Sequence, residues 1–184
     1  MKNTLITLFA ISLLVALGWF WLAPAGPAAS PDISVLDIDG NELRLADYRG
    51  RPLLVTFWAT TCPGCLREMP HLIELYRELA PRGLEIIGIA MAYDPPNHVL
   101  AMRDARRIPY PIALDIHADA AHAFGDVQLT PTSFLIAPDG RIVFRKSGEL
   151  DLARLRADII GMLAQAAAAS DCNKNQRDFR SCSG

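Results

Sequence analysis

The sequence has 184 residues, which suits one compact domain once short terminal segments are set aside. Apolar residues make up 51% of the chain and charged residues 21%, so the sequence can form a hydrophobic core. The formal net charge is -2 and no basic stripe is present, which argues against the binding of nucleic acid.

An uncharged apolar segment occupies residues 4–22. Its length approaches the ~20 residues of a membrane-spanning helix and exceeds the ~7–15 residues of a typical signal-peptide core. Trp19 and Trp21 lie at its far end, where aromatic rings favour the membrane interface. Lys2 is the basic residue nearest to this segment, so the positive-inside rule predicts that the N-terminus stays in the cytoplasm and that the rest of the chain is exported. Small residues at 23–28 leave a cleaved signal peptide as the alternative to an anchor.

Changes in composition divide the chain into four segments. We expect a signal anchor or signal peptide at 1–24, a Pro/Ala/Gly linker at 25–31, a folded domain at 32–169 and a polar tail at 170–184. The tail carries Phe179 as its single large apolar residue, so it adds little to a core.

The first predicted elements of the domain are strands. Two short apolar stretches at 33–38 and 42–45 surround a Gly/Asn turn, which is typical of a β-hairpin, and we expect two edge strands there. Residues 51–58 are apolar with almost no alternation, which predicts a central strand buried on both faces. Apolar residues at helical spacing over 63–79 predict a long helix directly after that strand.

The remaining segments alternate between strands and helices. We expect strands at 84–91 and 112–114, helices at 97–106 and 118–124, an antiparallel hairpin at 133–137 and 141–145, and a last helix at 150–169. This order predicts an α/β fold with a central mixed β-sheet flanked by helices and preceded by the N-terminal β-hairpin.

Cys62 and Cys65 are the main candidates for catalysis. They stand in the sequence Cys-Pro-Gly-Cys where the central strand runs into the helix, so Cys62 is expected at the helix N-cap and Pro63 at the first helical position. Unpaired amides and the helix dipole favour the thiolate form of Cys62 there. Cys65 lies on the same helix face, where it can resolve a mixed disulfide formed at Cys62. The pattern predicts a redox-active dithiol in which Cys62 attacks.

Two other uses of such a cysteine pair are alternatives. A zinc site needs two more ligands, and neither Cys172 with Cys182 nor the scattered histidines form a familiar ligand pair. A purely structural disulfide gains little, because closing so short a loop constrains the unfolded chain weakly. We therefore expect no metal and no cofactor.

Three motifs carry a resemblance to a known family: Phe-Trp-Ala-Thr-Thr-Cys-Pro-Gly-Cys at 57–65, Glu-Met-Pro at 68–70 and Thr-Pro-Thr at 130–132. With them the chain resembles the thioredoxin superfamily and, more narrowly, its membrane-anchored TlpA/ResA-like thiol-disulfide oxidoreductases. The resemblance covers about residues 31–165 and implies a thioredoxin fold.

The resemblance also implies roles for the residues around the dithiol. Pro131 is expected to be cis and to face the dithiol, although cis bonds are a small minority of X-Pro bonds in folded proteins. Thr130 would then offer its backbone to a substrate in an extended contact. We expect the rest of the substrate-binding surface at Trp58, Thr61, Pro63 and Gly64.

Glu68 is the candidate proton acceptor. Related TlpA/ResA-like proteins have a glutamate one helical turn beyond the second cysteine, where a partly buried carboxylate can accept the Cys65 proton. Thioredoxin itself has a buried aspartate on the central strand at the position of Thr56 in this chain, which strengthens the case for Glu68. The alternative is an ordinary solvated glutamate.

The residues and the resemblance together predict an exported thiol-disulfide oxidoreductase on the periplasmic side of the inner membrane. The resemblance favours a reductant of exported proteins with cysteine thiols or disulfides, such as apocytochrome c or copper-site proteins. It also implies a membrane electron donor of the DsbD/CcdA type. The alternatives are a dithiol oxidase, a Sco-like copper-binding module, whose cysteines are spaced CxxxC, and a peroxiredoxin, whose motif proline is missing here.

The second cysteine pair lies in the polar tail, outside the family pattern. Cys172 and Cys182 enclose a short polar loop, and a disulfide there would contribute about 3 kcal/mol in the chain-entropy estimate. We expect a structural disulfide, with a second redox relay or a metal clip as alternatives.

Overall fold

The computed structural model describes residues 12–13 and 28–181, with side chains up to residue 168. Most of the predicted anchor at 4–22, linker residues 25–27 and Cys182 lie outside the described residues. Within the described ranges, no helix is both long and apolar enough to cross a membrane.

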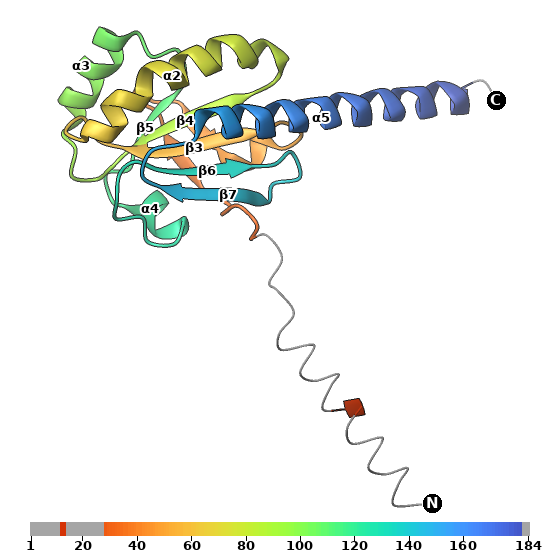
Figure 1. Ribbon diagram of the computed structural model, residues 1–184, viewed down its shortest axis with the longest axis horizontal. Coiled ribbons are helices and arrows are strands. Elements are labelled where there is room, and N and C mark those ends of the chain that lie inside the picture. The colour runs from red at the N-terminus through yellow and green to blue at the C-terminus, as the bar shows by residue number, and fades with distance from the viewer. Residues whose placement is uncertain (1–11, 14–27, 182–184) are drawn as a thin grey trace, which may run out of the picture.

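A five-stranded mixed sheet forms the centre of the described part of the chain (Figure 1). The spatial order of its strands is β5 (Ile112–Leu114), β4 (Glu85–Ala90), β3 (Leu53–Trp58), β6 (Thr132–Ile136) and β7 (Ile142–Ser147). β3 pairs in parallel with β4 and antiparallel with β6, and every residue of β3 is buried, as predicted for the central strand. β4 pairs in parallel with β5, and β6 pairs antiparallel with β7, so the predicted C-terminal hairpin is confirmed.

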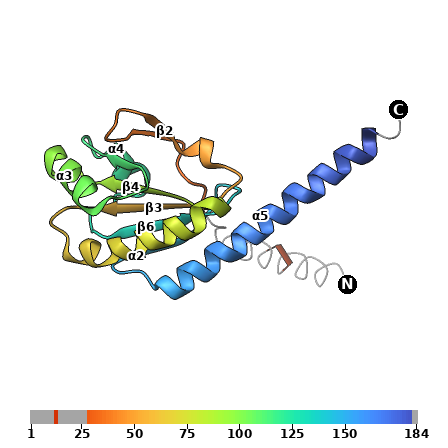
Figure 2. The ribbon, with the colours of Figure 1, turned by 90° about the horizontal axis from the view of Figure 1, so that it is seen from above.

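Helices and the hairpin cover the two faces of this sheet (Figure 2). One face packs against α2 (Pro63–Leu79), α3 (Pro96–Arg106) and α5 (Leu152–Ser181), and the other against the N-terminal hairpin and α4 (Asp119–Ala123). Because side chains alternate along β3, Trp58 faces α2 whereas Phe57 faces α4. Cys62 and Cys65 belong to the same core cluster as Trp58, on the α2 side of the sheet.

The predicted N-terminal hairpin is present, but it does not supply edge strands to the central sheet. β1 (Ser34–Leu36) and β2 (Glu42–Arg44) form a separate two-stranded antiparallel sheet. Val35 is buried in the core on the α4 side, so burial of the hairpin's apolar face holds it over the sheet. A single bridge between Asp37 and Ala113 links it to β5.

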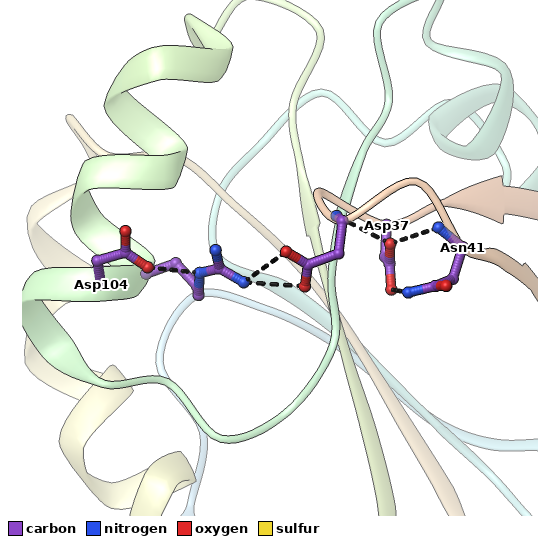
Figure 3. Close-up of polar contacts among 5 residues, drawn as sticks. Asp37, Asn41 and Asp104 are labelled. Atoms are coloured by element: carbon purple, nitrogen blue, oxygen red, sulfur yellow. Dashed lines mark hydrogen bonds and ion pairs between the residues drawn. The ribbon is translucent and has the colours of Figure 1, made fainter.

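Polar contacts fix the hairpin turn (Figure 3). The Asp37 carboxylate accepts hydrogen bonds from the backbone N–H groups of Asp39 at 2.9 Å and Asn41 at 2.7 Å, and from the Asn41 side-chain amide at 2.9 Å. Arg103 of α3 forms ion pairs with Asp39 and Asp104 at 2.9 and 2.8 Å. The turn is thus connected to α3.

The helix boundaries agree with the sequence at α2, which covers the predicted 63–79, and differ most at α5. The last helix was expected to end at 169, but it continues to Ser181, beyond the domain (Figure 1). An alanine-rich run at 164–169 has high helix propensity, and a helix satisfies its own backbone hydrogen bonds without a core to cover it. Two short 3-10 helices, η1 (Leu45–Tyr48) and η2 (Ala80–Arg82), complete the described elements.

Candidate active site

Cys62 and Cys65 form a disulfide bond at the junction of β3 and α2. Cys62 is the N-cap of α2 with extended backbone, and its Sγ accepts a hydrogen bond from the Cys65 N–H at 3.1 Å. Pro63 occupies the start of the helix, so both sequence predictions about this junction are confirmed. Cys62 is 8% exposed and Cys65 is 4% exposed, so both residues are buried in this disulfide form.

The peptide bond between Thr130 and Pro131 is cis, as the family resemblance implied. Pro131 lies against the first turn of α2 between the two cysteines: a Cβ added to Gly64 would lie 3.3 Å from Pro131 Cδ. The loop before β6 is therefore brought to the dithiol from a distant part of the sequence. Thr132, the first residue of β6, fixes this loop by donating from its hydroxyl group to the Leu129 carbonyl at 2.7 Å.

Glu68 lies one turn beyond Cys65 on α2 and is 5% exposed, so it is not an ordinary solvated glutamate. The backbone N–H of Leu150 donates a hydrogen bond to its carboxylate at 2.7 Å. Burial raises the pKa of Glu68, and the charge of Glu149 adds to that rise. The Leu150 N–H and His71 act in the opposite direction without reversing it. A carboxyl group with a raised pKa beside a thiol is suited to proton exchange.

Glu68 and Cys65 both line one small cavity. Its volume is about 10 Å³, and its lining includes the cis proline and both buried aromatic side chains of this region. The lining residues are Thr56, Trp58, Cys65, Glu68, Met69, Leu72, Tyr110 and Pro131. We call it the Glu68 cavity.

The other residues predicted to bind substrate differ in exposure. Thr61 and Pro63 are exposed, and Gly64 and Thr130 are partly exposed, so these four can meet a protein partner. Trp58 is 4% exposed and lies beneath the dithiol. Trp58 therefore supports the site from the core and exposes almost no surface that a substrate could contact.

Asp94 is a site residue that the sequence reasoning missed. Its carboxylate, 5% exposed, accepts hydrogen bonds from both the backbone N–H and the hydroxyl group of Thr60, each at 2.6 Å. Thr60 stands two residues before Cys62, so Asp94 fixes the loop that carries the first cysteine. An acidic residue a few positions after the second buried strand, at the sheet edge that also carries the dithiol, was the available signal.

Exposed residues around the dithiol were also missed. Tyr93 is 60% exposed, and its hydroxyl group lies 3.3 Å from Thr130 Oγ1. Leu129, which precedes Thr130 in the sequence, is 69% exposed. On the other side, Glu149 lies next to Gly64 and forms an ion pair with Arg67, whose Nε donates at 3.0 Å. The dithiol is therefore bordered by apolar surface on one side and by paired charges on the other.

Within the described residues, no group of three His, Cys, Asp or Glu side chains is placed to hold a metal ion. Cys172 is part of α5, and its predicted partner Cys182 lies outside the described residues. The proposed disulfide between them stays a prediction.

These features define a class of protein. A mixed sheet in the order β5-β4-β3-β6-β7, a cysteine pair where β3 meets α2, and a cis proline against that pair are the arrangement of a thioredoxin-fold thiol-disulfide oxidoreductase. The pair is in its disulfide form here.

Comparisons with known proteins place the chain more narrowly. Residues 28–145 match the AhpC/TSA family. The thiol-disulfide oxidoreductase ResA of Geobacillus thermodenitrificans is 34% identical over 144 residues, which cover 74% of this chain and 82% of the relative. ResA of Halalkalibacterium halodurans is 35% identical over 122 residues, which cover 66% of this chain and 68% of that one.

A solved structure agrees with these sequence matches. The crystal structure of a thiol:disulfide interchange protein of the thioredoxin family from Chlorobium tepidum has a TM-score of 0.69 and 27% identity, covering 77% of this chain and 99% of that one. The chain therefore belongs to the AhpC/TSA family and is a ResA-like thiol-disulfide oxidoreductase of the thioredoxin superfamily.

Proposed function

We propose that this oxidoreductase works outside the cytoplasm as a reductant of disulfides in exported proteins. One observation carries the proposal: the Cys62–Cys65 pair at the start of α2 lies against cis-Pro131 and has the buried Glu68 carboxyl group one turn behind it. This arrangement supplies a nucleophile, a resolving thiol, a surface for an extended peptide and a proton acceptor.

Attack on the substrate is the first chemical step. In the reduced enzyme, the helix N-terminus and the Cys65 N–H stabilise a thiolate at Cys62. The thiolate attacks one sulfur of the substrate disulfide, and the other substrate sulfur leaves with the electron pair. Thr130, Thr61, Pro63 and Gly64 form the contact surface for the substrate chain around this mixed disulfide.

Resolution by Cys65 is the second step. Glu68 accepts the proton from the Cys65 thiol, and the resulting thiolate attacks Cys62 Sγ. The Cys62–Cys65 disulfide forms, and the second substrate sulfur leaves as a thiolate. Two electrons have then passed from the enzyme dithiol to the substrate, which is released with both of its cysteines reduced.

The compartment and the partners extend this proposal. The apolar segment at 4–22 supports export with anchoring in the inner membrane. A membrane electron donor of the DsbD/CcdA type would reduce the Cys62–Cys65 disulfide again. The proposed substrates are apocytochrome c or copper-site proteins, whose paired cysteines must be reduced before they bind haem or metal.

The deciding experiment measures the reduction potential of the Cys62–Cys65 couple in the full-length chain. Cys172→Ser with Cys182→Ser removes the other two thiols, so that thiol trapping in redox buffers reports one couple. We expect a potential near that of thioredoxin, about -270 mV. A potential near the -120 mV of the oxidant DsbA would contradict the reductant role.

Activity on a defined substrate completes the test. The reduced enzyme is mixed with an oxidised peptide containing Cys-x-x-Cys-His, the attachment sequence for c-type haem. We expect two peptide thiols for each enzyme disulfide formed, and none with Cys62→Ser. Turnover of hydrogen peroxide in place of the peptide would favour the peroxiredoxin alternative.

A further inference from the structure

Trp58, which lines the Glu68 cavity, carries a buried hydrogen-bond donor without an acceptor among the described residues. Trp58 Nε1 is buried and has no hydrogen-bond partner among the described residues. Buried N–H groups in this condition are rare in folded proteins, and ordered water is a common partner for them. The cavity volume of about 10 Å³ is close to the ~10–15 Å³ that one water molecule needs.

Tyr110 is the second polar group of this cavity that the mechanism does not use. It is 5% exposed, and its ring makes an edge-on contact with Tyr76 at 5.8 Å. Trp58 Nε1 and Tyr110 Cε2 lie 3.2 and 3.4 Å from the position that a Cβ on Gly88 would take, so the indole N–H and the phenol ring are neighbours. Ile112 Cδ1 already lies 2.7 Å from that position, so no open space is left there, and the space shared by Trp58 and Tyr110 is the Glu68 cavity, which both residues line.

Both aromatic groups can donate a hydrogen bond, and Glu68 can accept one. The Tyr110 hydroxyl group is protonated at neutral pH, since tyrosine ordinarily has a pKa of about 10 and burial and the charge of Glu68 raise the pKa of Tyr110 further. One Glu68 oxygen accepts from the Leu150 N–H, and a carboxylate has lone pairs for further donors. Two donors and one acceptor around a space of this size match the two to four hydrogen bonds of a typical buried water.

We propose that the Glu68 cavity binds one water molecule, which accepts hydrogen bonds from the Trp58 indole N–H and the Tyr110 hydroxyl group and donates one to the Glu68 carboxylate. Tyr110 is thus a positioning residue, since it acts on Glu68 through the water. The water gives the largely buried Glu68 carboxylate a second hydrogen-bond donor beside the Leu150 N–H. Its effect on catalysis rests on the proposed role of Glu68, whereas the water site itself does not.

Several charged or titratable groups face Glu68, and the test must hold them constant. Glu149 and the Leu150 N–H approach from the loop before α5, His71 lies on α2, and Tyr110 approaches from the loop before β5. Tyr110→Phe removes one hydroxyl group and keeps the ring, so it leaves the other groups in place. Tyr76→Phe is the matched control, because Tyr76 contacts the Tyr110 ring but does not line the cavity.

The experiment uses NMR on the full-length oxidised chain with labelled tryptophan and labelled glutamate carboxyl groups. Trp58→Phe and Glu68→Gln assign the two signals. We expect magnetisation transfer between the Trp58 indole proton and a long-lived water. We also expect Tyr110→Phe to raise the midpoint of the Glu68 titration by a few tenths of a pH unit or more, with no change in Tyr76→Phe.

Two results would overturn the water site: no transfer from water to the Trp58 indole proton, or a Glu68 midpoint that is the same in Tyr110→Phe as in the wild type. If Tyr110→Phe fails to fold, the transfer experiment on the wild-type chain decides alone. Neither measurement needs turnover. An oxidising potential at the dithiol would therefore end the proposed reductant role and leave these two results unaffected.

Discussion

The Leu150 N–H donates a 2.7 Å hydrogen bond to the carboxylate of Glu68, although 82 residues separate the two in the chain. This bond ties the loop between β7 and α5 to the helix that carries both cysteines. It also gives the buried carboxylate one fixed donor, which partly offsets the cost of burial. Glu68 is therefore held in place beside the dithiol, with a pKa that burial still raises.

The first prediction concerns the pH dependence of stability. Because the pKa of Glu68 is raised in the folded state, the folded chain keeps a proton that the unfolded chain releases above its ordinary pKa of about 4.5. The contribution of Glu68 to the free energy of unfolding therefore falls as pH rises from 4.5 through the folded pKa. Glu68→Gln should lack this fall and gain stability relative to the wild type on going from pH 4 to pH 7.

Chemical denaturation of the oxidised protein at several pH values checks this expectation. Glu74→Gln, an exposed position on the same helix, is the control and should follow the wild type. Parallel curves for Glu68→Gln and the wild type would show that burial does not raise the Glu68 pKa. In the same variant, the proposed mechanism requires slower resolution of the mixed disulfide.

The second prediction concerns the loop before Cys62. Asp94→Asn should lower the free energy of unfolding by about 1–3 kcal/mol, because the amide cannot accept both Thr60 hydrogen bonds as a buried carboxylate does. Thr60→Val removes the hydroxyl bond alone and should cost about 1 kcal/mol. In the double variant the two losses should not add, since they share one interaction. Additive losses would mean that the two residues stabilise the protein independently.

Much of the local structure could be predicted from the sequence because it depends on neighbouring residues. The Cys-Pro-Gly-Cys stretch between an apolar run and an amphipathic run is enough to place Cys62 at the N-cap and Pro63 at the start of α2. Pro131 is different, because nothing around it requires a cis bond. The family resemblance supplied that prediction, and the structure confirms it.

The parts of the site that the sequence did not reveal depend on contacts between distant residues. Asp94 meets Thr60 across 34 positions, and Glu149 meets Arg67 across 82. A single sequence gives no register between such segments, since only the packed sheet brings the ends of β4 and β7 beside the start of α2. The end of α5 was misjudged for another reason: polar composition indicated a tail, but helix propensity does not require burial.

The third prediction compares two glycines in helices. A Cβ at Gly64 would lie 3.3 Å from Pro131 Cδ and 3.6 Å from Glu149 Oε1, whereas a Cβ at Gly161 would meet nothing within 4 Å. Gly161→Ala should therefore stabilise the protein by about 0.5–1 kcal/mol through helix propensity. Gly64→Ala should show less of this gain, because Pro131 must move.

The same pair of variants tests whether Gly64 gives access to the dithiol. We expect kcat/KM for disulfide reduction to fall several-fold in Gly64→Ala and to stay unchanged in Gly161→Ala. Equal activity in both variants would show that the close approach of Gly64 to Pro131 does not matter for the reaction. Thermal unfolding of the oxidised forms provides the stability values for the comparison.

The fourth prediction concerns the exposed ion pair between Arg67 and Glu149. Both side chains are more than half exposed, so Glu149→Gln should change stability by less than about 1 kcal/mol. The negative charge of Glu149 contributes to the raised pKa of Glu68, and its removal should lower that pKa. If Glu68 accepts the Cys65 proton as its carboxylate, the acidic limb of the pH–rate profile should move to lower pH in Glu149→Gln.

Asp139→Asn is the control, because it changes an exposed carboxylate that is not among the charges acting on Glu68. It should leave the pH–rate profile unchanged. A profile that is the same in all three proteins would remove Glu68 from the rate-limiting proton transfer.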